Sequence, residues 1–263
     1  MSSKNKTNYN TLNLVGVVPM AGYAKRLGDI GGSKEIYPIP LENLTSSNPP
    51  TVICEHLLQK FTLANISNVY IVLRDGKWDI PEYLGSGSKN NLHLAYLMRD
   101  LPYGTPYSID QVYPFAKNSL LALGFPDMML GEGDLYGILL QRFKEVGADV
   151  MLGLFPADHP EKVDMVEVTH NGEVENIVIK PKQTNLDSTW GIAIWNPRFT
   201  QFMHDFLLVH QRTAETAPEL FIGDVIQAGI KQGLRVHGCQ ISDRPFLDIG
   251  TPEDLEKIQR FTS

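Results

Sequence analysis

The most informative stretch of the sequence is LNLVGVVPMAGYAKRLGDIGGSKEIYPI, residues 12–39. Its first eight residues are mostly apolar, which predicts a buried strand over 12–19. The loop that follows contains four glycines and two well-separated cations, Arg26 and Lys34. Glycine lets a backbone approach a ligand closely and turn its N–H groups toward it. In open parallel sheets, ligands bind beyond the carboxyl ends of the strands, so this loop is a candidate binding loop for a polyphosphate.

Beyond this stretch, apolar runs alternate with segments of helical period. The segment 51–65 places its apolar side chains on one helical face, and a second helix is expected from Asp134 as N-cap to Gly147 as stop. Strands joined by helices of this length predict a mostly parallel sheet with helices on both faces. The strands expected in this half are 12–19, 69–74, 92–98, 120–125 and 150–155.

The pattern changes after residue 160. Two alternating runs flank Asn171 and Gly172, which predicts a β-hairpin with a type I′ turn. A strand over 190–195 and helices over 198–210 and 219–231 follow. We expect an α/β fold with a β-hairpin insertion, in which residues 1–11 are a disordered tail and 12–263 a single domain.

The last helix has a strong start signal in FLDIGTPEDL. Thr251 is a candidate N-cap, Pro252 occupies the first helical position, and Asp254 places a carboxylate in the first turn. The helix is therefore expected to begin at residue 252.

Composition and charge narrow the function classes. The formal net charge of −7 argues against broad nucleic-acid binding, although a local group of cations can still hold a small anion. No apolar run approaches the ~20 residues of a membrane span, and the polar N-terminal segment does not resemble a signal peptide. Two cysteines without metal or disulfide spacing suit a reducing, cytoplasmic location. The sequence leaves the oligomeric state open, a homo-oligomer included.

Two aspartates help to decide between a phosphate-binding loop and a solvated surface loop. On composition alone, a surface loop with two solvated cations is an equal alternative, because neither G-x-x-x-x-G-K-[ST] nor G-x-G-x-x-G is present. Asp127 lies at the carboxyl end of a predicted central strand, and Asp248 lies just before the last helix. Mg²⁺ commonly uses one or two protein carboxylates together with substrate phosphates and water. Two such residues beside a basic glycine loop favour a metal-bound phosphate ligand.

Five segments together resemble the signature of the sugar-1-phosphate nucleotidyltransferases. MAGYAKRL followed by SKEIYPI is similar to A-G-x-G-T-R-L followed by P-K. LGFPD, VIKP, WGIAIWNPRF and LDIGTPEDL are similar, in the same order, to the leucine-glycine-aspartate, glutamate-lysine-proline, A-G-I-Y-x-F and D-x-G-T-P-E-D-L segments of that family. The resemblance covers nearly the whole chain from about residue 12. It implies a Rossmann-like sheet of the nucleotide-diphospho-sugar transferase type.

The resemblance also implies roles for the matching residues. Arg26 and Lys34 would contact the triphosphate, Asp127 and Asp248 would bind Mg²⁺, and Lys180 would hold the sugar phosphate. Gly191 would let the sugar approach the backbone. The remaining implied nucleotide-binding residues are Met20, Ala21, Gly22, Arg99 and Gly104.

Several positions depart from the family pattern. Ala24 and Lys25 replace the second loop glycine and the hydroxyl residue before the arginine, and Pro126 replaces the glycine before the first metal aspartate. In the sugar region, Ile179 stands where the family has glutamate, and Val163-Asp164 stands where it has tyrosine-glycine. An isoleucine cannot hydrogen-bond a hydroxyl, so these departures put the identity of the acceptor in doubt.

The resemblance implies a Mg²⁺-dependent nucleotidyltransferase that joins an NTP to a sugar 1-phosphate and releases pyrophosphate. The base is open, with dTTP, UTP and CTP favoured. The interval between Arg26 and Lys34 is also two residues shorter than in the hexose-1-phosphate enzymes of the family. Two alternatives stay open: nucleotidyl transfer to another phosphorylated metabolite, which Ile179 and this shorter interval encourage, and a degenerate nucleotide-binding regulator.

Overall fold

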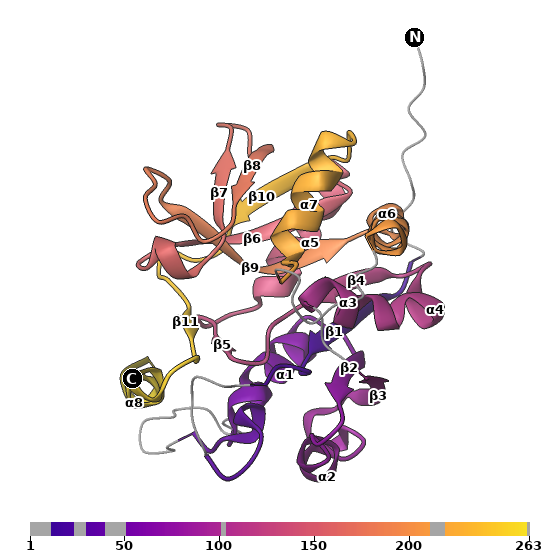
Figure 1. Ribbon diagram of the computed structural model, residues 1–263, viewed down its shortest axis with the longest axis vertical. Coiled ribbons are helices and arrows are strands. Elements are labelled where there is room, and N and C mark those ends of the chain that lie inside the picture. Colours follow the sequence, from indigo (N-terminus) through magenta and orange to yellow (C-terminus); the bar gives the residue numbers. More distant parts are fainter. Residues whose placement is uncertain (1–11, 24–29, 40–50, 101–103, 211–218, 262–263) are drawn as a thin grey trace.

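The computed structural model describes residues 12–23, 30–39, 51–100, 104–210 and 219–261. A twisted central sheet runs through the molecule (Figure 1). Every strand along its main path is parallel to the others except β9, which pairs antiparallel with β4 and β6. The predicted mostly parallel sheet is confirmed. The order across the sheet is β10 (Val236–Gln240), β6 (Val150–Pro156), β9 (Ser188–Trp195), β4 (Leu120–Leu123), β1 (Leu14–Pro19), β2 (Asn68–Arg74) and β3 (His93–Arg99).

Helices cover both faces of this sheet, as the sequence predicts. The first face packs on α1 (Ile53–Leu63), α2 (Asp79–Leu84) and α5 (Leu135–Val146). The second face packs on α3 (Thr105–Ile109), α4 (Tyr113–Ala116), α6 (Pro197–Val209) and α7 (Ile222–Lys231). Side chains alternate between the two faces along β1: Val15 and Val17 join one apolar cluster, and Val18 and Met20 join the other.

The helix boundaries follow the predicted capping residues. The Asp134 carboxylate accepts a hydrogen bond from the Gly137 N–H at 2.8 Å, and Gly147 ends α5 with φ 61. The last helix, α8 (Pro252–Phe261), begins where the sequence predicts. Asp254 Oδ2 accepts hydrogen bonds from the Thr251 N–H at 3.0 Å and the Thr251 hydroxyl at 2.8 Å, so the two residues close the first turn.

The predicted hairpin forms from β7 (Met165–Val168) and β8 (Val174–Val178), but its turn is not type I′. Type I′ requires positive φ at both central residues, and only Gly172 (φ 85) of the Asn-Gly pair has it. The Gly172 N–H donates to the Thr169 carbonyl at 2.9 Å, so the turn spans 169–172 and the loop is longer than expected. The prediction of turn type is therefore wrong, because the pairing of the two strands ends at Val168 and Val174 and leaves a longer loop around Asn171 and Gly172.

A second, two-stranded sheet lies outside the main one, and the sequence does not predict it. It pairs β5 (Met128–Met129) with β11 (Leu247–Asp248) in antiparallel fashion (Figure 1). A small apolar cluster of Ile39, Ile53, Met129, Ile249 and Ile258 joins this sheet to α1 and α8. Through this cluster, the C-terminal segment packs onto the first half of the chain.

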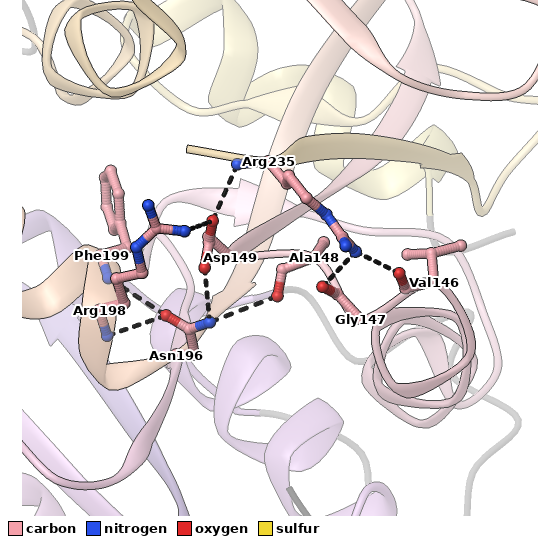
Figure 2. Close-up of polar contacts among 8 residues, drawn as sticks. All are labelled: Val146, Gly147, Ala148, Asp149, Asn196, Arg198, Phe199 and Arg235. Atoms are coloured by element: carbon pink, nitrogen blue, oxygen red, sulfur yellow. Dashed lines mark hydrogen bonds and ion pairs between the residues drawn. The ribbon is translucent and has the colours of Figure 1, made fainter. Parts of the chain in front are cut away.

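A polar network fixes the end of the sheet at which β6 begins (Figure 2). The buried Asp149 carboxylate accepts hydrogen bonds from Asn196 Nδ2 at 3.0 Å, Arg198 Nη1 at 2.8 Å and the Arg235 N–H at 2.9 Å. Asn196 also caps α6, and the Arg235 guanidinium donates to the carbonyls of Val146 and Gly147 at the end of α5. The network therefore ties β6, α5, α6 and the start of β10 together. None of the described helices is long and apolar enough to cross a membrane.

Candidate functional site

The two aspartates of the sequence motifs lie at the two-stranded sheet. Asp248 is in β11, opposite Met128 of β5, and Asp127 immediately precedes β5. The Ile249 N–H donates to the Asp127 carbonyl at 2.9 Å. The two-stranded sheet that the sequence does not predict thus brings the two aspartates together.

Lys34 joins this pair. Its ammonium forms an ion pair and hydrogen bond with Asp127 Oδ2. Burial acts to lower the pKa of Lys34, but the Asp127 carboxylate, with smaller contributions from Glu35 and Asp248, outweighs it and raises the pKa. One cation and two carboxylates, from three distant parts of the chain, therefore share one electrostatic environment.

Two further contacts hold the segment that carries Lys34. Ser33 donates from its N–H to Asp79 Oδ2 at 2.7 Å and from its hydroxyl to Asp79 Oδ1 at 2.8 Å. Glu35 forms a buried ion pair with Lys77 at 2.6 Å. Burial lowers the pKa of Lys77, and Glu35 partly offsets that effect. Asp79 and Lys77 both come from the segment after β2. No motif near Lys34 in the sequence indicates them, so neither contact could be predicted from the sequence.

The start of the glycine loop lies at the carboxyl end of β1. Met20 and Ala21 are buried, and the Met20 N–H donates to the Val72 carbonyl at 2.8 Å. At Gly22, no described atom lies within 4 Å of the position that a Cβ would take. Arg26 lies outside the described residues.

Lys180 lies just after β8, in the left-handed region with φ 41. Its Nζ is 4.1 Å from the centroid of the Phe221 ring, a cation–π contact. Lys180 and Asp248 both line a pocket of about 260 Å³ between the end of β6 and the C-terminal segment. The predicted sugar-phosphate lysine and one predicted metal aspartate therefore share a cavity.

Packing restricts two of the three glycines that are predicted to contact substrate. Gly191 lies at a register shift in the pairing of β9 with β6, and a Cβ there would come within 3.1 Å of both Phe155 and Phe246. Gly104 has φ 131, and a Cβ there would lie 2.4 Å from the Leu220 carbonyl oxygen. The left-handed φ and the backbone contact require glycine at Gly104, and the two aromatic rings leave little space for a larger residue at Gly191. A role of either backbone toward a substrate stays a prediction.

Arg99 ends β3, with its guanidinium carbon 5.6 Å from the centroid of the Tyr107 ring. Neither Arg99 nor Gly104 is among the residues that line the pocket. A role of either residue toward the nucleotide stays a prediction.

The residues present fit a magnesium site that depends on its substrate. Among the described residues, no group of three or more His, Cys, Asp or Glu side chains could hold a metal ion. Two neighbouring carboxylates remain, and the ammonium of Lys34 beside Asp127 shows that a cation is stable there. Mg²⁺ needs only one or two protein carboxylates when phosphate oxygens and water complete its coordination.

Comparison with known proteins decides the family. The family model described as "Nucleotidyl transferase" matches residues 16–263. The chain belongs to this family. The predicted resemblance is thereby confirmed at the family level. Enzymes of the nucleotidyl transferase family generally use a divalent metal ion.

Individual relatives are distant in sequence but similar in fold. The chain is 23% identical over 245 residues to the low-salt glycan biosynthesis nucleotidyltransferase Agl11 of Haloferax volcanii, with 91% of this chain and 63% of that protein covered. A Bacillus anthracis structure assigned as a glucose-1-phosphate thymidylyltransferase, in complex with a sucrose, matches with TM-score 0.79 at 18% identity over 95% of both chains. The inositol-1-phosphate CTP transferase from T. maritima matches with TM-score 0.70 at 15% identity, over 96% of this chain and 97% of that one.

These matches confirm the predicted fold class, a nucleotidyl transferase sheet flanked by helices. The chain spans less than two thirds of the length of the first curated relatives that it matches. The activity and substrates of this chain therefore have to be argued from its own residues.

Proposed function

We propose that this chain is a Mg²⁺-dependent nucleotidyltransferase that joins an NTP to a sugar 1-phosphate, or to a related phosphorylated metabolite, and releases pyrophosphate. The observation that carries the proposal is the convergence of Lys34, Asp127 and Asp248 beside the pocket that Lys180 and Asp248 line. Membership of the nucleotidyl transferase family supports it.

In this proposal, the acceptor phosphate attacks the α-phosphorus of the NTP, and pyrophosphate leaves. An acceptor phosphate is already an anionic nucleophile, so the chain needs no activated serine, cysteine or strong general base. The obstacle is repulsion between anions and the charge that develops on the leaving group. Positioned cations lower that barrier because they stabilise charge where it forms.

Each proposed residue then has one task. Lys34 stays protonated beside Asp127, so it can counter the charge of the leaving pyrophosphate, together with Arg26 of the same loop. Lys180 orients the acceptor phosphate at the wall of the pocket. Asp127 and Asp248 would hold the Mg²⁺ ion, which when bound would neutralise charge on the phosphate oxygens. The backbone at Met20, Ala21 and Gly22 would receive the nucleotide.

The base and the acceptor are left to experiment. The names of the similar proteins include a thymidylyltransferase and a CTP transferase whose acceptor is inositol 1-phosphate. We therefore propose dTTP, UTP or CTP as the nucleotide. A sugar 1-phosphate is the leading acceptor, and another phosphorylated polyol is the alternative.

The direct test measures pyrophosphate release with each of the four NTPs and dTTP, Mg²⁺, and a panel of sugar and polyol phosphates. Asp127→Asn and Asp248→Asn should each lower the turnover by about 10²- to 10³-fold or more. The matched control is Asp243→Asn, because Asp243 is an exposed aspartate on the same C-terminal segment and should not affect turnover. Wild-type protein that binds nucleotide without turnover on the whole panel would instead favour a degenerate regulator.

A further inference from the structure

Asp127 lies beside a strand that is too short to fix its own position. β5 consists of Met128 and Met129, and its partner β11 is equally short. An isolated two-stranded ladder is marginal in water, so contacts from outside this ladder have to set the course of β5. A side chain that anchors β5 from outside therefore also sets where the Asp127 carboxylate lies.

His56 of α1 is such a side chain, and it has no task in the proposed reaction. Its Nε2 atom lies 2.9 Å from the backbone nitrogen of Leu130 and 2.8 Å from the carbonyl oxygen of the same residue. Leu130 directly follows β5 and is 1% exposed, so its backbone groups need a partner inside the protein. Outside the strand ladder, the His56 ring is the hydrogen-bond partner that the described part of the chain gives to Leu130.

Either hydrogen bond joins α1 to the end of β5. A neutral imidazole with its proton on Nδ1 accepts from the Leu130 N–H, and the tautomer with its proton on Nε2 donates to the Leu130 carbonyl. Burial lowers the pKa of His56 to about 4, the charge of Lys60 adds to this effect, and the Leu130 backbone acts against it. The ring is thus neutral near pH 7, and it holds the segment without a charged partner.

The two ends of β5 are held by different means. At its start, the Asp127 carbonyl accepts from the Ile249 N–H at 2.9 Å. At its end, Leu130 is bonded to His56, while Met129 packs in the small apolar cluster with Ile53 of α1. Apolar packing has no preferred direction, whereas a hydrogen bond does. The bond to His56 therefore fixes the orientation of the backbone, which packing of Met129 alone leaves open.

We propose that His56 is a positioning residue for the metal site: by holding Leu130 it fixes β5, and through β5 it fixes the direction of the Asp127 carboxylate. The inference rests on the proposed nucleotidyl transfer and adds a residue of α1 to its metal site. His56 contacts neither the ion nor the substrates, and it acts through the backbone of residues 127–130.

The test compares His56→Gln with His56→Asn. Both replace the ring by a neutral amide that can donate and accept, but the asparagine side chain is one methylene shorter and does not reach Leu130. Mn²⁺ is the probe, and electron paramagnetic resonance measures the free ion with and without an α,β-methylene analogue of UTP, CTP or dTTP. His56→Asn should raise the dissociation constant of Mn²⁺ about tenfold, and His56→Gln should stay within about threefold of the wild type.

Turnover gives a second measurement. In His56→Asn, the Mg²⁺ concentration for half-maximal turnover should rise by the same factor, while kcat at saturating Mg²⁺ and the KM for the acceptor stay near the wild-type values. The matched control is Thr62→Val, because the Thr62 hydroxyl donates from the same helix to the Asn90 carbonyl at 2.8 Å, in the segment before β3. This variant should lose stability without a change in Mn²⁺ binding or in the Mg²⁺ requirement.

The outcomes separate this inference from the proposed reaction. His56→Asn with wild-type Mn²⁺ binding in an active enzyme overturns the positioning role and leaves the reaction standing. An equal weakening in His56→Gln or Thr62→Val would show general destabilisation, and it would overturn the role as well. A wild type that binds Mn²⁺, with the expected order of the two His56 variants but no turnover, would contradict the reaction and retain the role. A wild type that binds no Mn²⁺ would overturn both.

Discussion

At the scale of single residues, the site combines charges that would not be stable apart. Lys34 is largely buried, and its side chain retains 13% of its exposure, so an uncompensated ammonium there would be costly. Asp127 provides the compensation, and the Glu35–Lys77 pair and the Ser33–Asp79 hydrogen bonds fix the backbone on both sides of Lys34. The cation is therefore positioned before any ligand arrives, which is the condition for electrostatic catalysis.

Asp164 gives a prediction about pH and stability. Burial raises its pKa to about 6, so as the pH rises the carboxyl ionises in the unfolded chain before it ionises in the folded one. The stability associated with the neutral acid is complete below about pH 4 and is lost as the pH passes about 6. Asp164→Asn cannot ionise and should have a higher free energy of unfolding than the wild type at pH 8, by about 2 to 3 kcal/mol.

Urea unfolding of both proteins at pH 4 and pH 8 measures this difference. The two free energies should coincide at pH 4 and diverge at pH 8. The charged groups that face the carboxyl are Lys180 and Asp224, and both are retained in the variant. A difference of equal size at both pH values would show that the substitution acts through packing and not through ionisation.

At the scale of elements, the long periodic segments were predictable and the short pairings were not. The strands over 12–19 and 150–155 and the helix capped by Asp134 carry enough apolar residues to show their period. β5 and β11 have two residues each, which is too short for any period, and they exist because the chain returns there 120 residues later. The type of the turn at Asn171 was predicted wrongly for a similar reason, because the pairing of β7 with β8, and not the Asn-Gly dipeptide, sets the register of the hairpin.

The candidate site was also predictable only in part. The positions of Lys34, Asp127 and Asp248 could be predicted because each lies in a local motif of the nucleotidyl transferase family. Their mutual contacts could not, because these depend on the β5–β11 pairing. The sequence marks Asp164 only as a departure from the family pattern, and its burial without a donor to Oδ1 among the described residues comes from the coordinates.

The network around Asp149 gives a prediction for the elements it joins (Figure 2). Asp149→Ala removes three accepted hydrogen bonds and leaves the buried Asn196 amide without one of its partners. We expect a loss of about 2 to 4 kcal/mol in the free energy of unfolding. Turnover per folded molecule should not change, because Asp149 is at the start of β6, and the candidate pocket is at its end.

Arg198→Ala is the matched control for this network. The Arg198 side chain is 61% exposed, so its ion pair with Asp149 should contribute less than about 1 kcal/mol. Denaturant unfolding and pyrophosphate release, measured on both variants, separate the two effects. An Asp149→Ala protein of wild-type stability would mean that the network does not hold β6, α5, α6 and β10 together.

At the scale of the whole molecule, the site depends on how the C-terminal segment packs. Lys34 and Asp127 come from the first half of the chain and Asp248 from the C-terminal segment. That segment is held by the small cluster of Ile39, Ile53, Met129, Ile249 and Ile258, which is separate from the two large clusters of the main sheet. A weak attachment there would separate the two proposed metal carboxylates without unfolding the sheet.

Ile258 of α8 tests this arrangement, because it is 1% exposed and is not among the residues that line the candidate pocket. Ile258→Ala should weaken the attachment of the segment by about 2 to 4 kcal/mol, the usual effect of truncating a buried isoleucine. Amide exchange should then rise over 247–258 first, and the Mg²⁺ concentration needed for half-maximal turnover should increase, with high Mg²⁺ restoring part of the rate.

Leu139→Ala makes a comparable cavity in the main core and should lower global stability without changing the Mg²⁺ requirement. If the two variants instead change exchange and Mg²⁺ dependence alike, the C-terminal segment unfolds only with the sheet, and the position of Asp248 is set by the molecule as a whole.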